Sequence, residues 1–286
     1  MNAANVVSWL GASADKARVL LSPSEFARFR NALDAVGGVS YLKEAGVSKF
    51  TAYQYHHGRR NIPLKIFANL SKDFSGKALT IKFNKNSSKA VSIPLELNDD
   101  VAYLAGAMRD GCLIQVKERI IGIALVPGDK SWEGTLASLL EKTFGLSPKK
   151  YGDNLVLYNG AVGCFFNGFL GMPLHSQASW ETPKPVLDAA LETKRHYIAG
   201  FFDAEGCCFS KGNDKRIIFY QNNWISLYEI KEMLGALGVE CGEIVRDKRT
   251  RNRRITISKR NSLKRFVAVV PSRHPRKREK LVKLCC

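Results

Sequence analysis

The stretch HYIAGFFDAEGCC, residues 196–208, decides how this chain folds. Apolar and small residues fill its first part, and two acids, Asp203 and Glu205, stand near its end. Small residues such as Ala199 and Gly200 remove side-chain bulk and allow two helix backbones to approach closely. The stretch therefore predicts a tightly packed helix with an acid at its carboxyl end.

The chain repeats this pattern. VAYLAGAMRDGCLIQVKERIIGIALV starts at residue 101, and HYIAGFFDAEGCCFSKGNDKRIIFYQ starts at residue 196. Each reads as an apolar helix, an acid followed by glycine and two short strands, and an amphipathic helix and more strand-like sequence follow. Asp110 and Glu205, 95 residues apart, hold the same place in the two copies. A repeat of this size predicts two similar units that pack about a pseudo-two-fold axis.

The two acids predict a metal site. If the apolar helices lie side by side, the carboxylates of Asp110 and Glu205 meet at one point. Repulsion between like charges and the negative ends of two helix dipoles make that arrangement unfavourable, and a divalent cation relieves both. Ligation by oxygen alone suits Mg²⁺, with Mn²⁺ as a substitute, and such ions support phosphodiester hydrolysis.

The charge of the chain indicates a polyanionic partner. The sequence has 44 Lys and Arg against 26 Asp and Glu, which leaves a net charge of +18. From Arg246 to Lys283, sixteen basic residues accompany only Asp247 and Glu279. Such an excess favours nucleic acid as the partner. With no bilayer-length apolar run and no signal-peptide pattern at the start, we expect a cytoplasmic, nucleoid-associated protein without a membrane partner.

The first 75 residues read as a small all-α domain. Within VSYLKEAGVSKFTAYQYHHGRR, a short helix ends at Gly46 and Ser48 caps a second helix. This arrangement resembles the helix-turn-helix of phage repressors, whose second helix enters the major groove. The DNA-contacting residues expected here are Lys49, Thr51, Gln54, Arg59 and Arg60. A plain helical hairpin without DNA contacts is the alternative.

The chain is expected to divide into four parts. Residues 76–98 alternate like an extended hairpin or linker, and Pro94 stops them from continuing as a helix into the next unit. The four parts are a helix-turn-helix domain at 1–75, this linker at 76–98, a first repeat at 99–185 and a second repeat at 186–286.

The motif residues carry a family resemblance. IAGFFDAEG, Ile198 to Gly206, resembles the LAGLIDADG motif at every position, and YLAGAMRDG, Tyr103 to Gly111, resembles it more loosely. The resemblance is to the LAGLIDADG homing endonucleases with two motifs in one chain, and it covers residues 98 to 283. It implies an α+β fold in which each repeat is αββαββα and two saddle-shaped antiparallel sheets straddle double-stranded DNA. It also implies a monomeric enzyme of intron homing that cuts both strands with Mg²⁺.

The resemblance assigns further site residues. Gly111 and Gly206 join Asp110 and Glu205 at the metal. In the second repeat, Gln221 is expected to position water and Lys277 to approach the scissile phosphate, with Arg276 or Arg278 as alternatives to Lys277. In the first repeat, the equivalents are less clear and fall on Asp129 or Lys130 and on Gln177. The alternative for each of these residues is a plain surface or DNA-backbone role.

The first motif departs from the family pattern. When the terminal acid and glycine are aligned, Ala105 stands where the motif glycine belongs and Arg109 stands at a normally small position. We expect a looser or tilted helix pair as a result. Asp203 points away from Glu205, two positions further on, and is assigned to helix-end hydrogen bonding. The five histidines lack metal-ligand spacing, which argues against zinc.

The strands are expected to read the DNA. Charged and apolar residues alternate in the strand segments, so one face would meet the core and the other the major groove. The residues assigned to the duplex face are Lys117, Arg119, Lys211, Lys215, Arg216, Arg249, Arg251 and Arg253. Because phosphate contacts dominate affinity, binding should weaken steeply as salt rises.

Two functions compete on this sequence. The first is a site-specific, Mg²⁺-dependent endonuclease that cuts double-stranded DNA. The second is a non-cleaving protein on the same scaffold, either a transcription regulator or an RNA maturase with intron RNA as its partner. The retained acids favour the nuclease, because a binder gains nothing from their repulsion. The irregular first motif and the extra domain favour the binder.

Overall fold

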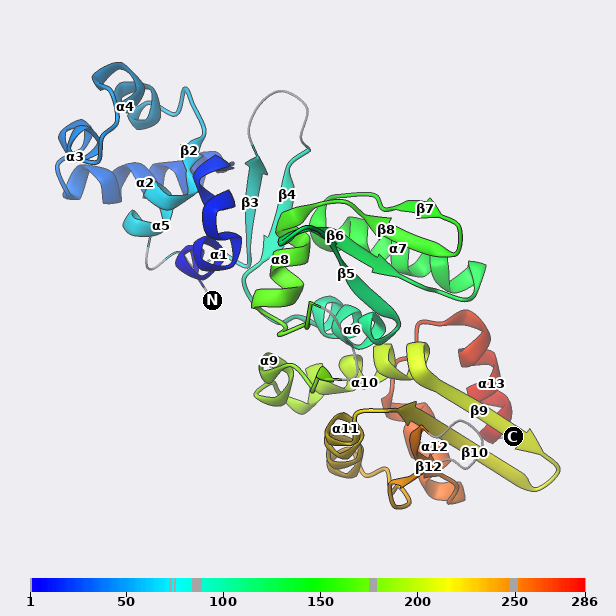
Figure 1. The fold of residues 1–286 in the computed structure, drawn as a ribbon. Helices are drawn as coiled ribbons and strands as arrows, with labels where there is room; N and C mark the ends of the chain where they lie inside the picture. Colours follow the sequence, from blue (N-terminus) through cyan, green and yellow to red (C-terminus); the bar gives the residue numbers. More distant parts are fainter. Residues whose placement is uncertain are drawn as a thin grey trace. The chain divides into compact units, whose positions relative to one another are not determined.

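The computed structural model describes residues 2–71, 74, 76–83, 89–174, 179–246 and 252–285. The chain divides into two compact units (Figure 1). The first unit comprises Met1–Glu96 and the short segment Phe144–Leu146, and the second comprises Leu97–Thr143 and Ser147–Cys286.

The first unit combines helices with a sheet. Its elements are α1 (Ala3–Leu10), η1 (Gly11–Lys16), β1 (Ala17–Val19), α2 (Pro23–Ala35), α3 (Val39–Glu44), α4 (Lys49–His56), β2 (Ile62–Pro63), α5 (Leu64–Leu70), β3 (Ala78–Phe83) and β4 (Val91–Pro94). The four strands pair antiparallel in the order β2-β1-β3-β4. The unit therefore differs from the predicted all-α domain, and residues 76–98 supply two strands of its sheet. The three-residue β1 was missed because its pairing to β3 joins segments some sixty residues apart.

The helix boundaries in this unit follow local chemistry. Ser22 and Glu25 form a reciprocal capping box at the start of α2, with Pro23 at the first helical position. Between α3 and α4 the chain turns at Gly46, whose φ of 82° suits glycine, and the Ser48 hydroxyl caps α4 by accepting from the Thr51 amide. The two predicted helices and their turn are therefore present. Their contact with DNA stays a prediction.

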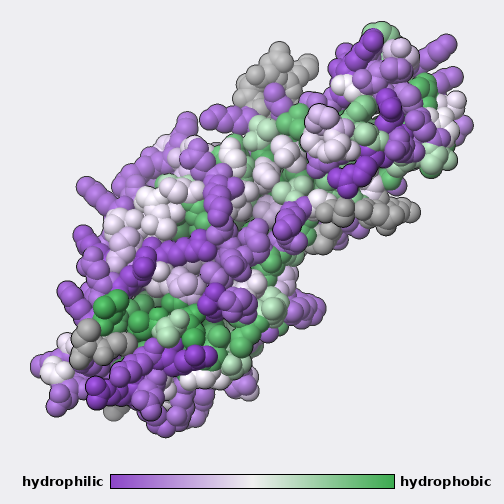
Figure 2. Space-filling view, turned by 180° about the vertical axis from the view of Figure 1, so that it is seen from behind, coloured by the Kyte–Doolittle hydropathy of each residue, from purple (hydrophilic) through white to green (hydrophobic). Residues whose placement is uncertain are grey.

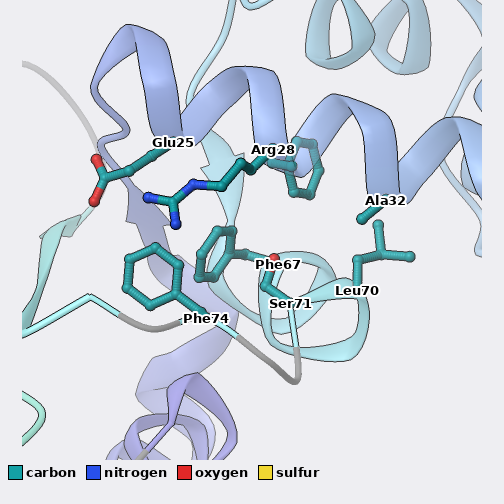
Figure 3. A pocket seen from close by; sticks show the side chains of 8 residues that line it. Glu25, Arg28, Ala32, Phe67, Leu70, Ser71 and Phe74 are labelled. Carbon is teal, nitrogen blue, oxygen red and sulfur yellow. The ribbon is translucent and has the colours of Figure 1, made fainter.

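A small pocket lies between α2 and α5. It has a volume of about 190 Å³ and is lined by Phe29 and Ala32 from α2 and by Phe67 and Leu70 from α5. Figure 3 shows the Arg28 side chain extending from α2 alongside the aromatic rings. The pocket marks where the two helices pack through aromatic side chains, since the Phe29 and Phe67 rings stack 6.0 Å apart.

The second unit contains the same order of elements twice. The first copy is α6 (Asp99–Ala107) with η2 (Met108–Asp110), β5 (Gly111–Val116), β6 (Arg119–Leu125), α7 (Lys130–Phe144), β7 (Lys149–Tyr151), β8 (Asn154–Leu157) and α8 (Gly160–Gly168). The second copy is α10 (Leu191–Glu205), β9 (Gly206–Lys211), β10 (Asp214–Gln221), α11 (Trp224–Ala236), β11 (Val245–Arg246), β12 (Arg253–Ile257) and α12 (Arg260–Val269). The short α9 (Lys184–Leu187) joins the copies, and α13 (Pro275–Cys285) follows the second.

Both copies build the same sheet. The strand order is β5-β6-β8-β7 in the first copy and β9-β10-β12-β11 in the second, and every pairing is antiparallel. The mixed helix and antiparallel-sheet fold predicted from the sequence is confirmed, with the element order αββαββα in each repeat. Figure 1 shows α6 and α10 running next to each other between the two sheets.

Two glycines allow α6 and α10 to touch. A Cβ atom on Gly106 would lie 2.2 Å from the Tyr197 carbonyl oxygen, and one on Gly200 would lie 2.0 Å from the Tyr103 carbonyl oxygen. Gly106 and Gly200 are therefore equivalent, and the motif glycine was wrongly placed at Ala105. The first motif has one residue fewer between its glycine and its acid than the second, and the tighter 3₁₀ turn η2 absorbs the difference.

The core of the second repeat is aromatic. The rings of Phe201 and Phe202 on α10 pack against Phe219 of β10, which also contacts Phe266 of α12. This packing defines the helix-facing side of the sheet. Figure 2 shows hydrophilic residues over most of the visible surface, as the excess of Lys and Arg leads one to expect. Among the described residues, no helix is long and apolar enough to cross a membrane.

Candidate active site

The carboxylates of Asp110 and Glu205 influence each other electrostatically. Asp110 ends η2 and Glu205 ends α10, so each acid precedes the first strand of its repeat. Packed protein atoms and repulsion from Asp110 raise the pKa of Glu205 to about 7. Displaced solvent also raises the pKa of Asp110 above its ordinary value, although its side chain reaches the surface. The acids at the two motif ends therefore face a common region and oppose each other's ionisation.

Lys277 brings a positive charge to the same region. Its Nζ donates to the carbonyl oxygens of Phe202, Asp203 and Gly206 at 2.9, 2.7 and 2.6 Å, at the carboxyl end of α10. A cation at the negative end of a helix dipole is stabilised there. The ammonium lowers the pKa of both Asp110 and Glu205, while burial lowers its own pKa. The alternatives Arg276 and Arg278 are less well placed, since Arg276 pairs with Asp129 at 2.8 Å.

Gln221 lies at the end of β10. It is 8% exposed, and its side-chain oxygen accepts from the Asn222 amide at 2.7 Å. In the ladder, Phe219 pairs with Gly206, so Gln221 stands two residues beyond the motif glycine. Gln221 shares the helix-facing side with Phe219, because strand residues alternate between faces. This position is compatible with the predicted role of Gln221, which stays a prediction.

Asp203 ties the second repeat to the first. Its buried carboxylate accepts from the Tyr103 hydroxyl at 2.6 Å and from the Ser272 hydroxyl at 2.5 Å. It also accepts from the backbone amides of Arg273 and His274 at 2.7 and 3.0 Å. Asp203 therefore does more than bond at its own helix end, as the sequence suggested. It fixes the segment that leads from α12 to Lys277.

Arg109 makes the corresponding connection in the first repeat. This side chain is 3% exposed, and its guanidinium donates to the carbonyl oxygens of Trp180 and Glu181 at 2.5 and 2.9 Å. It also donates to the Tyr197 hydroxyl at 2.7 Å and lies over the Trp180 ring at 4.5 Å. Arg109 does not loosen the helix pair, as we expected, but links α10 to the segment after α8. Its charge also lowers the pKa of Glu205.

The first-repeat candidates are less convergent. The Asp129 carboxylate accepts from the Ser131 amide and hydroxyl, besides its ion pair with Arg276. Lys130 is exposed at the start of α7. Gln177 lies outside the described residues, so its position stays a prediction.

The donor set at the acids fits a hard cation. The described residues contain no group of three or more His, Cys, Asp or Glu that could hold a metal ion. Two converging carboxylates with raised pKa values supply oxygen ligands alone, which suits an ion that keeps several waters. The Gly206 carbonyl is occupied by Lys277 in this structure, so its predicted part in the metal site requires that the lysine gives way. Gly111 begins β5 next to Asp110.

The sheet faces sort the predicted DNA contacts of the second repeat. On the face opposite the helices lie Lys211 and Arg216, and Arg216 is bound to Asp214 at 2.6 and 2.7 Å. Lys215 and Arg253 instead share the helix-facing side, and Arg253 lines a cavity with Trp224 of α11. This differs from the predicted duplex face for both residues. Arg254, which the sequence analysis passed over, lies on the outer face.

The remaining predicted contacts are at the surface or outside the description. Lys117 and Arg119 are exposed at the β5–β6 hairpin, and Arg249 and Arg251 lie outside the described residues. In the first unit, Lys49, Arg59 and Arg60 are exposed, whereas Thr51 and Gln54 are half-buried. The solvent face of α4 instead presents Phe50 at 69% exposure and Tyr53, which stacks on His57 at 3.9 Å. The spacing of these aromatic residues could have revealed this face.

Comparison with known proteins identifies the second repeat. Residues 192–271 match the family model of the LAGLIDADG-like domain. No curated protein matches the chain. Similar solved structures include a variant of the homing endonuclease I-DmoI with nicked target DNA and Mn (18% identity, TM-score 0.45, 62% of this chain and 97% of that chain). They also include I-DmoI with DNA and Mn (19%, 0.44, 62% and 98%) and the N-terminal LAGLIDADG domain of DUF199/WhiA (13%, 0.42, 65% and 86%).

Proposed function

We propose that this chain, in which residues 192–271 are a LAGLIDADG-like domain, is a site-specific endonuclease that cuts double-stranded DNA with a divalent cation. The observation that carries the proposal is the electrostatic coupling of Asp110 and Glu205 at the ends of two touching helices. A chain of net charge +18 supplies the attraction for a polyanion. The motif resemblance and the duplicated αββαββα fold support the same assignment.

Asp110 and Glu205 would hold the cation through their carboxylate oxygens, and we propose Mg²⁺ with Mn²⁺ as a substitute. When bound, such an ion lowers the pKa of an attacking water and stabilises the leaving oxygen. Ionised Glu205 is needed for ligation, and its pKa of about 7 makes proton loss and cation binding occur together. Lys277 adds a positive charge that neutralises the charge developing on the phosphate.

The hydrolysis is balanced by water alone. The water oxygen forms a bond to phosphorus while one phosphorus–oxygen ester bond breaks. One water proton passes to solvent, and the leaving oxygen takes up a proton. Gln221 would orient the attacking water through its side-chain amide, and Lys277, whose pKa burial lowers, is suited to supply a proton to the leaving oxygen.

One observation favours the non-cleaving alternative. In the first repeat, Gly111 pairs with Leu125, so the residue equivalent to Gln221 is Pro127, which has no hydrogen-bonding side chain. A regulator or RNA maturase would not need that group. The alternative is kept as the outcome of the test if binding occurs without cutting.

Selection of a binding site from a random DNA library, followed by cleavage mapping with Mg²⁺, tests the function. The wild type should cut the selected site, and Asp110→Asn and Glu205→Gln should each reduce the rate by at least about a hundredfold. The control is Asp188→Asn, because Asp188 is a surface acid paired with Lys184. Binding without cutting by the wild type would establish the alternative, and unchanged cutting by both variants would show that other residues hold the cation.

A further inference from the structure

The two repeats differ at the positions that surround the acids. Gly206 pairs with Phe219 in the second repeat, and Gly111 pairs with Leu125 in the first. Counting two residues along each strand gives Gln221 in one repeat and Pro127 in the other. An amide that can orient water therefore has no counterpart in the first repeat at the same register.

The lysine is also present on one side only. Lys277 reaches the last turn of α10 from the segment after α12. The corresponding segment of the first repeat, between the end of α8 at Gly168 and Lys184, has the sequence FLGMPLHSQASWETP, with neither lysine nor arginine. Lys184 itself pairs with Asp188 at 2.8 Å. The sequence of the first repeat thus offers no lysine for the equivalent place.

Arg109 does not replace the missing lysine. Its guanidinium is turned to the carbonyl oxygens of Trp180 and Glu181 and to the Tyr197 hydroxyl. It stacks between the rings of Trp180 and Phe201, at 4.5 and 5.2 Å from their centroids. A buried cation held by five such contacts serves the packing of the helix pair, and it cannot leave without exposing those carbonyls.

We infer that the two DNA strands are cut at unequal rates, and that the second repeat, with Lys277 and Gln221, makes the faster cut. This inference rests on the proposed nuclease function. The bond changes are those of hydrolysis by water at each strand. General acid and base groups accelerate such steps by about 10² to 10⁴, so the side that lacks them should be slower by at least about tenfold. A nicked duplex is therefore the obligatory intermediate.

Single-turnover cleavage of a supercoiled plasmid that carries the selected site tests this inference, with each strand labelled separately. The wild type with Mg²⁺ should accumulate nicked circle before linear product, and one strand should be cut at least about ten times faster than the other. Lys277→Met should slow the fast strand by at least about tenfold and change the slow strand by less than about threefold. Gln221→Leu should act on the same strand.

The control is Lys264→Met, because Lys264 is an exposed lysine on α12 with the same charge. This variant should keep the wild-type strand preference, and circular dichroism should show that all variants are folded. Equal rates on both strands, or an equal slowing of both by Lys277→Met, would overturn the inference while the nuclease proposal stands. No product from the wild type with either strand label would overturn both.

Discussion

Arg109 and Asp203 occupy equivalent positions in the two repeats, and each hydrogen-bonds to a tyrosine of the opposite central helix. Each lies three residues after its contact glycine, Gly106 or Gly200. Asp203 accepts from the Tyr103 hydroxyl and from backbone amides, whereas Arg109 donates to the Tyr197 hydroxyl and to backbone carbonyls. One structural position thus carries opposite charges in the two halves, and each charge is matched by the opposite set of backbone groups.

Replacement of Asp203 should destabilise the second unit. Asp203→Asn removes a buried charge that accepts from two hydroxyls and two amides, and an amide cannot accept from all of them. We expect a loss of about 2 to 4 kcal/mol in the free energy of unfolding, measured by urea denaturation. The matched variant Asp188→Asn on the surface should change it by less than about 0.5 kcal/mol. Equal midpoints for the two variants would contradict the assignment.

The helix contact should tolerate no added methyl group. Gly200→Ala places a Cβ 2.0 Å from the Tyr103 carbonyl oxygen, so α6 and α10 must separate. We expect a loss of at least about 3 kcal/mol or failure to fold. Gly134→Ala in α7 is the control, because its Cβ would meet nothing within 4 Å and alanine favours helix by about 1 kcal/mol. A stable Gly200→Ala protein would argue against this contact.

The apo protein should lose stability as pH rises. The folded pKa of Glu205 is about 7 against an ordinary value of 4.5, so the folded chain holds the proton more tightly than the unfolded chain. The stabilisation is complete below pH 4.5 and is lost as pH rises through 7. Between pH 5 and 8 in chelator, wild type should lose on the order of 2 kcal/mol more than Glu205→Gln, measured by urea denaturation.

Divalent cations should reverse that loss. Mg²⁺ or Mn²⁺ should raise the thermal midpoint of the wild type more at pH 8 than at pH 5.5, because protons compete for the same carboxylates. Asp110→Asn and Glu205→Gln should both lose the response. A cation effect of equal size at both pH values would indicate that the ions bind elsewhere.

The outer face of the second sheet should carry phosphate contacts. Lys211→Ala should weaken DNA binding at low salt and reduce the slope of log affinity against log salt by about 1. Lys264→Ala removes the same charge from α12, whose residue Phe266 packs on the opposite, helix-facing side, and should leave the slope unchanged. Fluorescence anisotropy over a range of salt concentrations measures both. Identical slopes in the two variants would show that this face does not meet DNA.

Much of this architecture could be predicted because its signals are local. The Ser48 cap, the turn at Gly46 and the apolar helix that ends at Glu205 each depend on neighbours within one or two helical turns. The repeat itself followed from matching residues 101–126 with 196–221. The pairing of β1 with β3 and the sheet face of Arg253 could not, because both depend on distant strands.

The sequence by itself determined the two-fold repetition, the acid at the end of each central helix and the basic character of the chain, since each is written in residue type and spacing. Only the tertiary structure decided that Gly106 faces Gly200, that the short 3₁₀ turn brings Asp110 level with Glu205, and that Arg109 is buried against Trp180. The physical reason is that close packing selects among alignments one residue apart, and sequence similarity cannot distinguish these without the contacts.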